Sequence, residues 1–65
     1  MTIKELYEAS RNPLILYDRT RITSEFIMTF GNFNVDMFCI DWRSNRIVVF
    51  PEGCYSTDDK KRWGV

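Results

Sequence analysis

The stretch that decides the fold is residues 22–42, ITSEFIMTFGNFNVDMFCIDW. Apolar and polar residues alternate along it with a period of two, which is typical of β-strands. Gly31 and Asn32 lie in its middle and suit a two-residue hairpin turn, because glycine supplies the positive φ that a type II′ turn needs first. The stretch therefore predicts two antiparallel strands in which Phe30 lies opposite Phe33. The same register pairs Met28 with Val35, Phe26 with Met37 and Ser24 with Cys39.

A second hairpin is predicted farther along the chain. Ser44 and Asn45 stand between two apolar runs, as turn residues do. A two-residue turn at this point places a third strand beside the second and fixes its register. Residues 50–53 then form a reverse turn that ends the third strand. The register pairs Trp42 with Ile47, Ile40 with Val49 and Cys39 with Phe50.

The residues that precede the deciding stretch predict a short helix and a further strand. Thr2 and Glu5 have the spacing of a capping box, which starts a helix. Pro13 pushes Asn12 out of the α region and therefore stops the helix there. Residues 14–17 are an apolar run just after the proline, and we expect a strand over them.

The C-terminal residues predict one last helical turn. Ser56 and Asp59 can cap it, and it runs to Arg62 before Gly64. Together the elements predict one α+β domain over residues 1–65. In this domain the short N-terminal helix packs on an antiparallel β-meander of three or four strands.

Both faces of the predicted sheet are apolar from Phe38 onward, although an antiparallel sheet with one wet face should alternate apolar and polar residues. We expect the N-terminal helix to cover the larger face, which carries Val48 and Phe50. The other face then presents an apolar patch with two open explanations: the C-terminal segment covers it with Tyr55 and Trp63, or a partner does. The predicted interface residues are Phe38, Ile40, Trp42, Ile47 and Val49.

The length of the chain favours a partner. A domain of 65 residues buries only about 60% of its unfolded surface, and small domains usually need a disulfide, a metal or oligomerisation. Two cysteines allow at most one disulfide, and there is no histidine to complete a zinc site. We therefore expect a non-enzymatic binding module that forms a homodimer or binds an unidentified protein as an adaptor or inhibitor.

Single-stranded nucleic acid is the alternative partner. Nine basic and nine acidic side chains give no net charge, which is unlike a binder of duplex DNA. Arginines near two predicted turns could still hold phosphates while sheet aromatics stack on bases. The residues predicted for this alternative are Tyr17, Arg19, Arg21, Arg43 and Arg46.

No catalytic, cofactor or metal site is predicted. Without histidine the chain lacks the commonest general base and metal ligand. Cys39 is expected in the core, while Cys54 has no neighbour that would lower its pKa. Asp36 and Asp41 are five apart on one strand and so point to opposite faces. No apolar run approaches a membrane span and residues 1–5 carry no signal core, which predicts a cytoplasmic protein with reduced thiols.

The opening residues 2–8, TIKELYE, resemble the start of many small proteins encoded by phages and other mobile elements of bacteria. The resemblance covers a single helix. It implies a small accessory or inhibitor protein that acts by binding, and it assigns no role to any residue.

Overall fold

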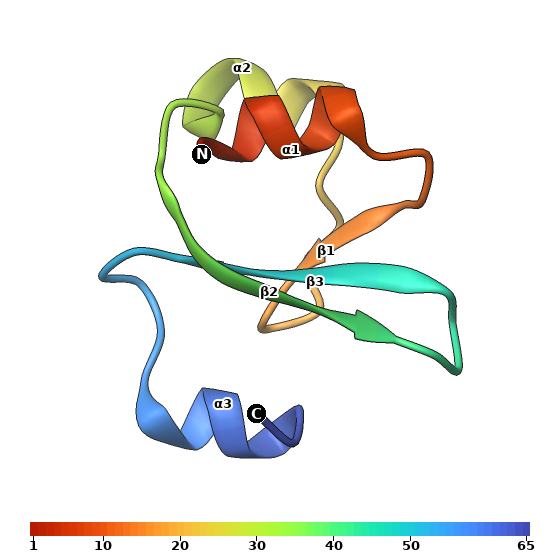
Figure 1. Cartoon of the computed structure of the whole chain (residues 1–65). Helices are drawn as coiled ribbons and strands as arrows, with labels where there is room; N and C mark the ends of the chain where they lie inside the picture. Colours follow the sequence, from red (N-terminus) through yellow and green to blue (C-terminus); the bar gives the residue numbers. More distant parts are fainter.

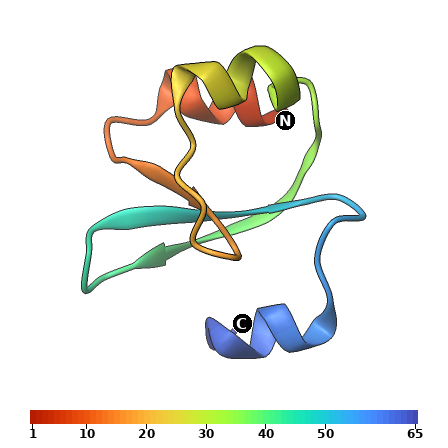
Figure 2. The ribbon, with the colours of Figure 1, turned by 180° about the vertical axis from the view of Figure 1, so that it is seen from behind.

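The centre of the molecule is strand β3, Arg46–Pro51, which lies between the two other strands of a mixed sheet. The other elements are α1 (Ile3–Ala9), β1 (Leu14–Leu16), α2 (Ser24–Phe30), β2 (Val35–Asp41) and α3 (Thr57–Arg62). The computed structural model covers residues 1–65 and shows a small α+β fold. Helices α1 and α2 lie on one side of the sheet and α3 lies on the other (Figure 1). The view from behind shows the same three layers (Figure 2).

Strand β3 is apolar along most of its length because both of its faces are buried. Ile47 and Val49 belong to a core cluster on the side of α1, and Val48 and Phe50 belong to a second cluster on the side of α3. All four side chains are buried. A strand covered on both faces carries a continuous apolar run instead of an alternating one. The two apolar faces inferred from the sequence are therefore present, and the chain's own helices cover both of them.

The N-terminal helix covers the opposite face from the one we expected. It packs on the side of Ile47 and Val49, while Tyr55 and Trp63 from the C-terminal segment pack against the Val48 and Phe50 side. The reason lies in the first N–H groups of α1, which have no partner within the helix. Those of Ile3 and Lys4 donate to carbonyls in the segment between α2 and β2, at 2.9 Å each. These bonds hold α1 beside α2.

The start of α1 is as predicted. The Thr2 hydroxyl accepts from the Glu5 N–H at 3.2 Å, and the Glu5 carboxylate accepts from the Thr2 N–H at 2.9 Å. This reciprocal pair is a complete capping box. The helix ends at Ala9, before Pro13, as expected of a segment that a proline follows.

The predicted strand over residues 22–30 is wrong, because Ser24–Phe30 is helix α2. Thr23 caps it by accepting from the Phe26 N–H at 3.2 Å. Gly31 follows the helix with φ −61° and ψ −22°, which is not the positive φ of the predicted hairpin turn. The spacing of Phe26, Ile27 and Phe30 also fits one face of a helix, so the period of two was ambiguous. The pairs that the first hairpin predicted, from Phe30 with Phe33 to Ser24 with Cys39, are therefore absent.

The sheet is not an antiparallel meander, and it has three strands. β1 pairs with β3 in parallel, with Leu14 opposite Ile47 and Leu16 opposite Val49. After β1 the chain reverses through Arg19, which has a φ of 72°, and then enters α2. Strand β2 lies beside β3 and antiparallel to it, so β3 is the central strand. The predicted strand over residues 14–17 is confirmed at Leu14–Leu16.

The second hairpin exists, but its register differs by two residues from the prediction. Ile40 lies opposite Ile47, Cys39 opposite Val48, Phe38 opposite Val49 and Met37 opposite Phe50. A two-residue type I′ turn requires positive φ at both central residues, and here only Asn45 has it, at 57°. The turn instead takes four residues, 42–45, between the Asp41 and Arg46 pair. A shift of two residues preserves which side chains share a face.

The C-terminal helical turn is α3. The Ser56 hydroxyl accepts from the Asp59 N–H at 3.3 Å, and the Asp59 carboxylate accepts from the Ser56 N–H at 2.8 Å. The Trp63 indole N–H donates to the Tyr17 carbonyl at 2.7 Å and ties this helix to the end of β1. None of the three helices has the length and apolar content that crossing a membrane requires.

Candidate protein interface

The outer edge of β2 is an unpaired strand edge. The sheet order is β1-β3-β2, so only one side of β2 has a neighbouring strand, and on the other side the N-terminal residues contact only its start, where the Val35 N–H donates to the Met1 carbonyl. In β3, the Ile47 N–H donates to the Pro13 carbonyl at 2.9 Å, and the Val49 carbonyl accepts from the Tyr17 N–H at 3.1 Å. Both residues therefore direct their backbone groups toward β1 and away from β2.

The direction of these bonds shows which β2 groups are free. Residues opposite each other in an antiparallel pair alternate between exchanging hydrogen bonds and turning away from each other. Ile47 lies opposite Ile40, and Val49 lies opposite Phe38. Since Ile47 and Val49 face β1, the N–H and C=O groups of Phe38 and Ile40 point out of the sheet. Two residues of β2 thus present free donors and acceptors to a partner strand.

Apolar side chains accompany this free backbone. Phe38 is 47% exposed and Ile40 is 39% exposed, on the face that carries Ile47 and Val49. Helices α1 and α2 bury that face over β3 but do not cover its β2 margin. Trp42 follows at the turn and is 81% exposed. The predicted interface is therefore divided: Ile47 and Val49 lie in the protein's own core, while Phe38, Ile40 and Trp42 lie at the surface.

Hydrogen bonds between its own residues stabilise the turn that carries Trp42. The Asp41 carboxylate accepts from the Arg43 N–H at 3.2 Å and from the Ser44 hydroxyl at 2.8 Å. The hydrogen bond from Ser44 is the main cause that lowers the pKa of Asp41. A short side chain that bonds the backbone two residues later stabilises a turn. Trp42 consequently projects from an ordered turn.

The inward side of β2 carries the Cys39 thiol. Cys39 is partly buried and packs against the cluster of Val48 and Phe50. Burial raises the pKa of its thiol, with a smaller contribution from the Asp41 carboxylate. Both Cys39 and Cys54 are free. No three His, Cys, Asp or Glu side chains lie close enough together to hold a metal ion.

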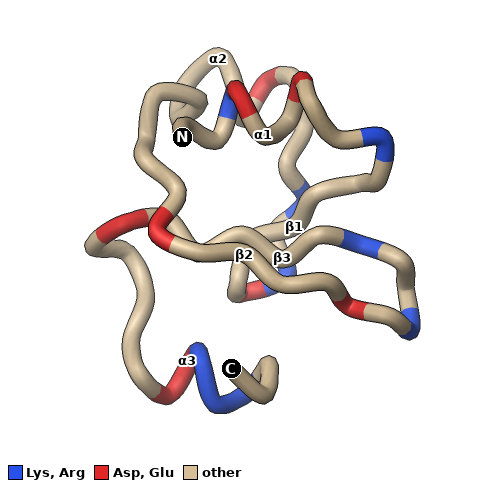
Figure 3. Tube along the Cα trace, viewed as in Figure 1, with Lys and Arg blue, Asp and Glu red and all other residues tan.

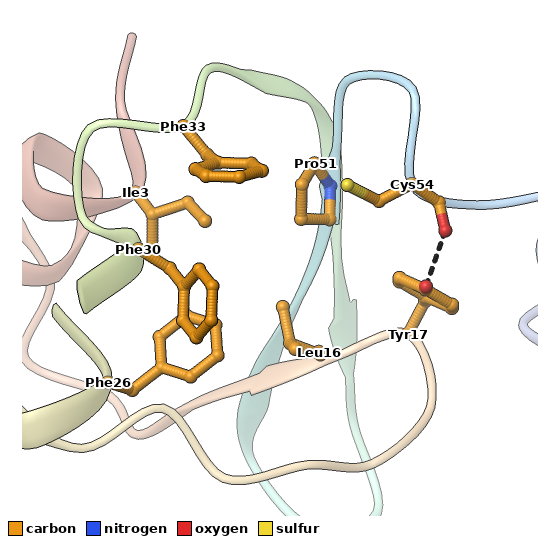
Figure 4. Close-up of a pocket in the computed structure, with 8 residues that line it drawn as sticks. All are labelled: Ile3, Leu16, Tyr17, Phe26, Phe30, Phe33, Pro51 and Cys54. Atoms are coloured by element: carbon orange, nitrogen blue, oxygen red, sulfur yellow. Dashed lines mark hydrogen bonds between the residues drawn. The ribbon is translucent and has the colours of Figure 1, made fainter.

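A separate apolar hollow lies at the other end of the sheet, and the sequence reasoning did not find it (Figure 4). Its volume is about 200 Å³. The rings of Phe26 and Phe30 lie 5.0 Å apart and those of Phe30 and Phe33 lie 5.7 Å apart, measured between centroids. The Tyr17 hydroxyl at the rim already donates to the Cys54 carbonyl. The full lining is Ile3, Leu16, Tyr17, Phe26, Phe30, Phe33, Pro51 and Cys54.

This hollow was missed because residues 22–30 were predicted to form a strand. Thr23 three residues before Phe26 was a helix-start signal, and with the helical spacing it would have brought Phe26 and Phe30 together. The same helix leaves Met28 87% exposed on its outer face. Met28 is isolated there, and single exposed apolar residues are normal.

Of the five residues predicted for nucleic acid, Tyr17, Arg19 and Arg43 line two hollows that share Arg19, Arg62 and Trp63. Arg19 lies over the Trp63 ring at 5.5 Å from its centroid. Both residues line one of these hollows together with Arg43 and Arg62. Asp41 lines that hollow too, and Arg62 lies 3.9 Å from Asp59. Positive charges there consequently have acidic neighbours, and basic and acidic residues are interspersed along the whole chain (Figure 3).

Tyr17 also packs against the core, and Arg21 and Arg46 lie outside these two hollows. Tyr17 stacks on Phe50 with 6.2 Å between ring centroids and meets Tyr55 at 6.3 Å, so its ring is part of an aromatic cluster. Arg21 lies in an isolated bridge with Ile15, and Arg46 lies opposite Asp41 at the end of β3. Of the five predicted residues, Arg19 shares one hollow with Arg43 and another with Tyr17.

No protein-family model matches the chain, and searches of the curated proteins and of the solved structures find no match either. Function must therefore be inferred from the chain's own residues.

Proposed function

We propose that the protein is a small non-enzymatic binding module that acts through protein–protein contact at the open edge of β2. The observation that carries this proposal is the pair of free backbone positions at Phe38 and Ile40 with half-exposed apolar side chains beside them. An extended segment can add to such an edge, taking affinity from main-chain hydrogen bonds and specificity from alternate side chains.

The part of the edge after the register shift between Val35 and Met37 carries little protection against pairing. Natural edge strands are commonly guarded by lysine, by proline or by an inward-pointing charge. Strand β2 reads VDMFCID and contains neither lysine nor proline. Its two acidic residues are engaged: Tyr55 donates to the Asp36 carboxylate, and Asp41 caps the neighbouring turn. The central part of the edge is thus uncharged and open.

Trp42 extends the surface beyond the strand. Tryptophan is among the residues that most often dominate binding energy at interfaces. At 81% exposure Trp42 adds nothing to the protein's own core, so a partner that covers it gains the burial of a large aromatic ring. Edge and turn together provide main-chain bonds and an anchor side chain.

A capture experiment with matched lysine variants tests this function. We compare the proteins retained from extracts of the source cells by the wild type, by Phe38→Lys/Ile40→Lys and by Met28→Lys. Lysine at the edge blocks strand addition. Met28→Lys places one charge at an exposed apolar residue away from the edge. We expect wild type and Met28→Lys to retain the same partner and the edge variant to lose at least about tenfold in affinity, which corresponds to 1.4 kcal/mol.

Circular dichroism of each variant verifies the fold before capture. Identical retention by all three folded chains would contradict a docking role for the edge. Because a second copy of the chain can itself be the partner, a tagged and an untagged form are included in the same comparison.

A further inference from the structure

We infer that the partner at the β2 edge is a second copy of this chain, joined antiparallel through β2 with Cys39 at the two-fold axis. This inference rests on the proposed function and names its partner. Two identical strands related by a two-fold axis always run antiparallel and contact each other through the same residues.

The free part of the edge is short and has a defined midpoint. Before it, the register of β2 shifts between Val35 and Met37, and the Val35 N–H already donates to the Met1 carbonyl at 2.7 Å. After it, the chain turns away at Asp41. The straight, unpaired segment is therefore residues 37–41, and its central residue is Cys39.

Centring the axis on Cys39 uses every free backbone group of this segment. Phe38 of one copy then lies opposite Ile40 of the other, and the reverse pair repeats the contact. Both residues direct their N–H and C=O groups outward, so each pair exchanges two hydrogen bonds as an antiparallel ladder requires. If the axis passes through Phe38, that residue lies opposite itself and Ile40 lies opposite Asp36 at the register shift. If it passes through Ile40, that residue lies opposite itself and Phe38 lies opposite Trp42 in the turn. Only the central register satisfies both free residues inside the strand.

The side chains are compatible with this register. Phe38 of one copy contacts Ile40 of the other on one face of the joined sheet, and opposed aromatic and β-branched side chains stabilise antiparallel pairs. Asp41 lies opposite Met37 of the other copy, so no two carboxylates face each other across the axis. The chain has no net charge, and two copies therefore do not repel each other at long range.

Cys39 provides a direct test of the register. It lies opposite Cys39 of the other copy as a pair without mutual hydrogen bonds, for which Cα atoms are about 4.5 Å apart. Disulfides span about 4.4–6.8 Å between Cα atoms. A mild oxidant such as copper–phenanthroline takes two electrons from the two thiols, which lose two protons as one S–S bond forms. The oxidant supplies the test and is not part of the function.

The experiment uses the full chain with Cys54→Ser, in which Cys39 is the one remaining thiol and the edge is unchanged. We expect sedimentation to show a monomer–dimer equilibrium, and oxidation to give a covalent dimer. Ile40→Lys in the same background should raise the dimer dissociation constant about tenfold or more and abolish cross-linking. Met28→Lys should leave both unchanged, and Cys39→Ser should sediment as a dimer that oxidation does not link.

The outcomes separate this inference from the proposed function. A chain that stays monomeric at all concentrations and does not cross-link overturns the homodimer. If Phe38→Lys/Ile40→Lys nevertheless loses a captured protein, the edge binds a different partner and the proposed function stands. If that variant captures the same proteins as the wild type, both fail. A dimer that forms without cross-linking through Cys39 overturns the central register.

Discussion

Gly31 illustrates how a single residue decides between two folds of the same stretch. Its backbone is right-handed, at φ −61° and ψ −22°, so it closes α2 and does not form the left-handed turn of a hairpin. A Cβ at this position would collide with the Ile27 carbonyl and approach its Cγ2 atom to 3.0 Å. The Gly31 carbonyl also accepts from the Lys4 N–H. Glycine is required here because of a close approach.

Replacing Gly31 with alanine tests whether the close approach to Ile27 requires glycine. We expect Gly31→Ala to lower the free energy of unfolding by about 1–3 kcal/mol, because the backbone of α2 must shift and the bond to Lys4 weakens. Urea denaturation followed by circular dichroism measures the change. Ser24→Ala, at an exposed position of the same helix, is the control and should stay within about 0.5 kcal/mol of the wild type. If Gly31→Ala is as stable as Ser24→Ala, the close approach to Ile27 does not require glycine at this position.

The two tryptophans contrast in their roles, and α3 explains the difference. Trp63 ends α3, packs against the cluster of Val48 and Phe50, and donates to the Tyr17 carbonyl. A helix of six residues cannot persist alone and must be held by such contacts. Trp42 makes no comparable contact and is 81% exposed. One ring therefore stabilises the fold, and the other is free for a partner.

Alanine at each tryptophan should separate these roles. We expect Trp63→Ala to destabilise the protein by about 1–3 kcal/mol, through loss of the partly buried ring and of its hydrogen bond. Trp42→Ala should change stability by less than about 0.5 kcal/mol. Thermal unfolding and urea titration of the two variants measure this. A loss of stability in Trp42→Ala equal to that of Trp63→Ala would show that the turn packs on the rest of the chain.

At the same scale, local signals predicted some elements and not others. The two capping boxes, at Thr2 and at Ser56, are formed by residues three apart, and both helices begin where the sequence indicated. The prediction for residues 24–30 was wrong because these seven residues fit both a strand period and a helical face. Thr23, which caps α2, was the local signal for a helix. The N–H groups at the start of α1 also bind carbonyls that follow α2, and single-sequence periodicity contains no information about these distant bonds.

The candidate site was predicted in part for the same reason. Faces along β2 and β3 follow from alternation alone, so Phe38 and Ile40 were correctly placed on one face with Ile47 and Val49. Which strand lies at the edge depends on β1 joining β3 in parallel, a contact between distant segments that no local pattern specifies. Burial of Ile47 and Val49 and exposure of Trp42 follow from that topology.

For the molecule as a whole, hydrogen-bonded carboxylates predict loss of stability in acid. The Thr2 backbone N–H, and then its hydroxyl, lower the pKa of Glu5 from 4.5, and the Ser56 backbone N–H is the main cause that lowers the pKa of Asp59 from 3.8. Ser44 acts likewise on Asp41. A carboxyl whose pKa is lower in the folded state contributes stability above its unfolded pKa, and loses it as the pH falls through the folded value.

We therefore expect the free energy of unfolding to be constant near neutral pH and to fall as the pH drops below about 4.5. Glu5→Gln tests one contribution, since glutamine keeps the capping box but does not titrate. Its stability should decline less steeply with acid than that of the wild type, as measured by urea denaturation at a series of pH values. Parallel curves for the two proteins would show that Glu5 contributes nothing to the acid transition.

The position of β3 in the sheet has a consequence for synthesis. Helix α1 and strand β1 are translated before the strand on which they pack, Arg46–Pro51. Until then, Leu14 and its neighbours have no surface to cover them, and pairing of such distant segments is slow. Residues 1–45 therefore emerge before the core can close. Whatever structure these residues take early, the native core can form only after β3 has followed them.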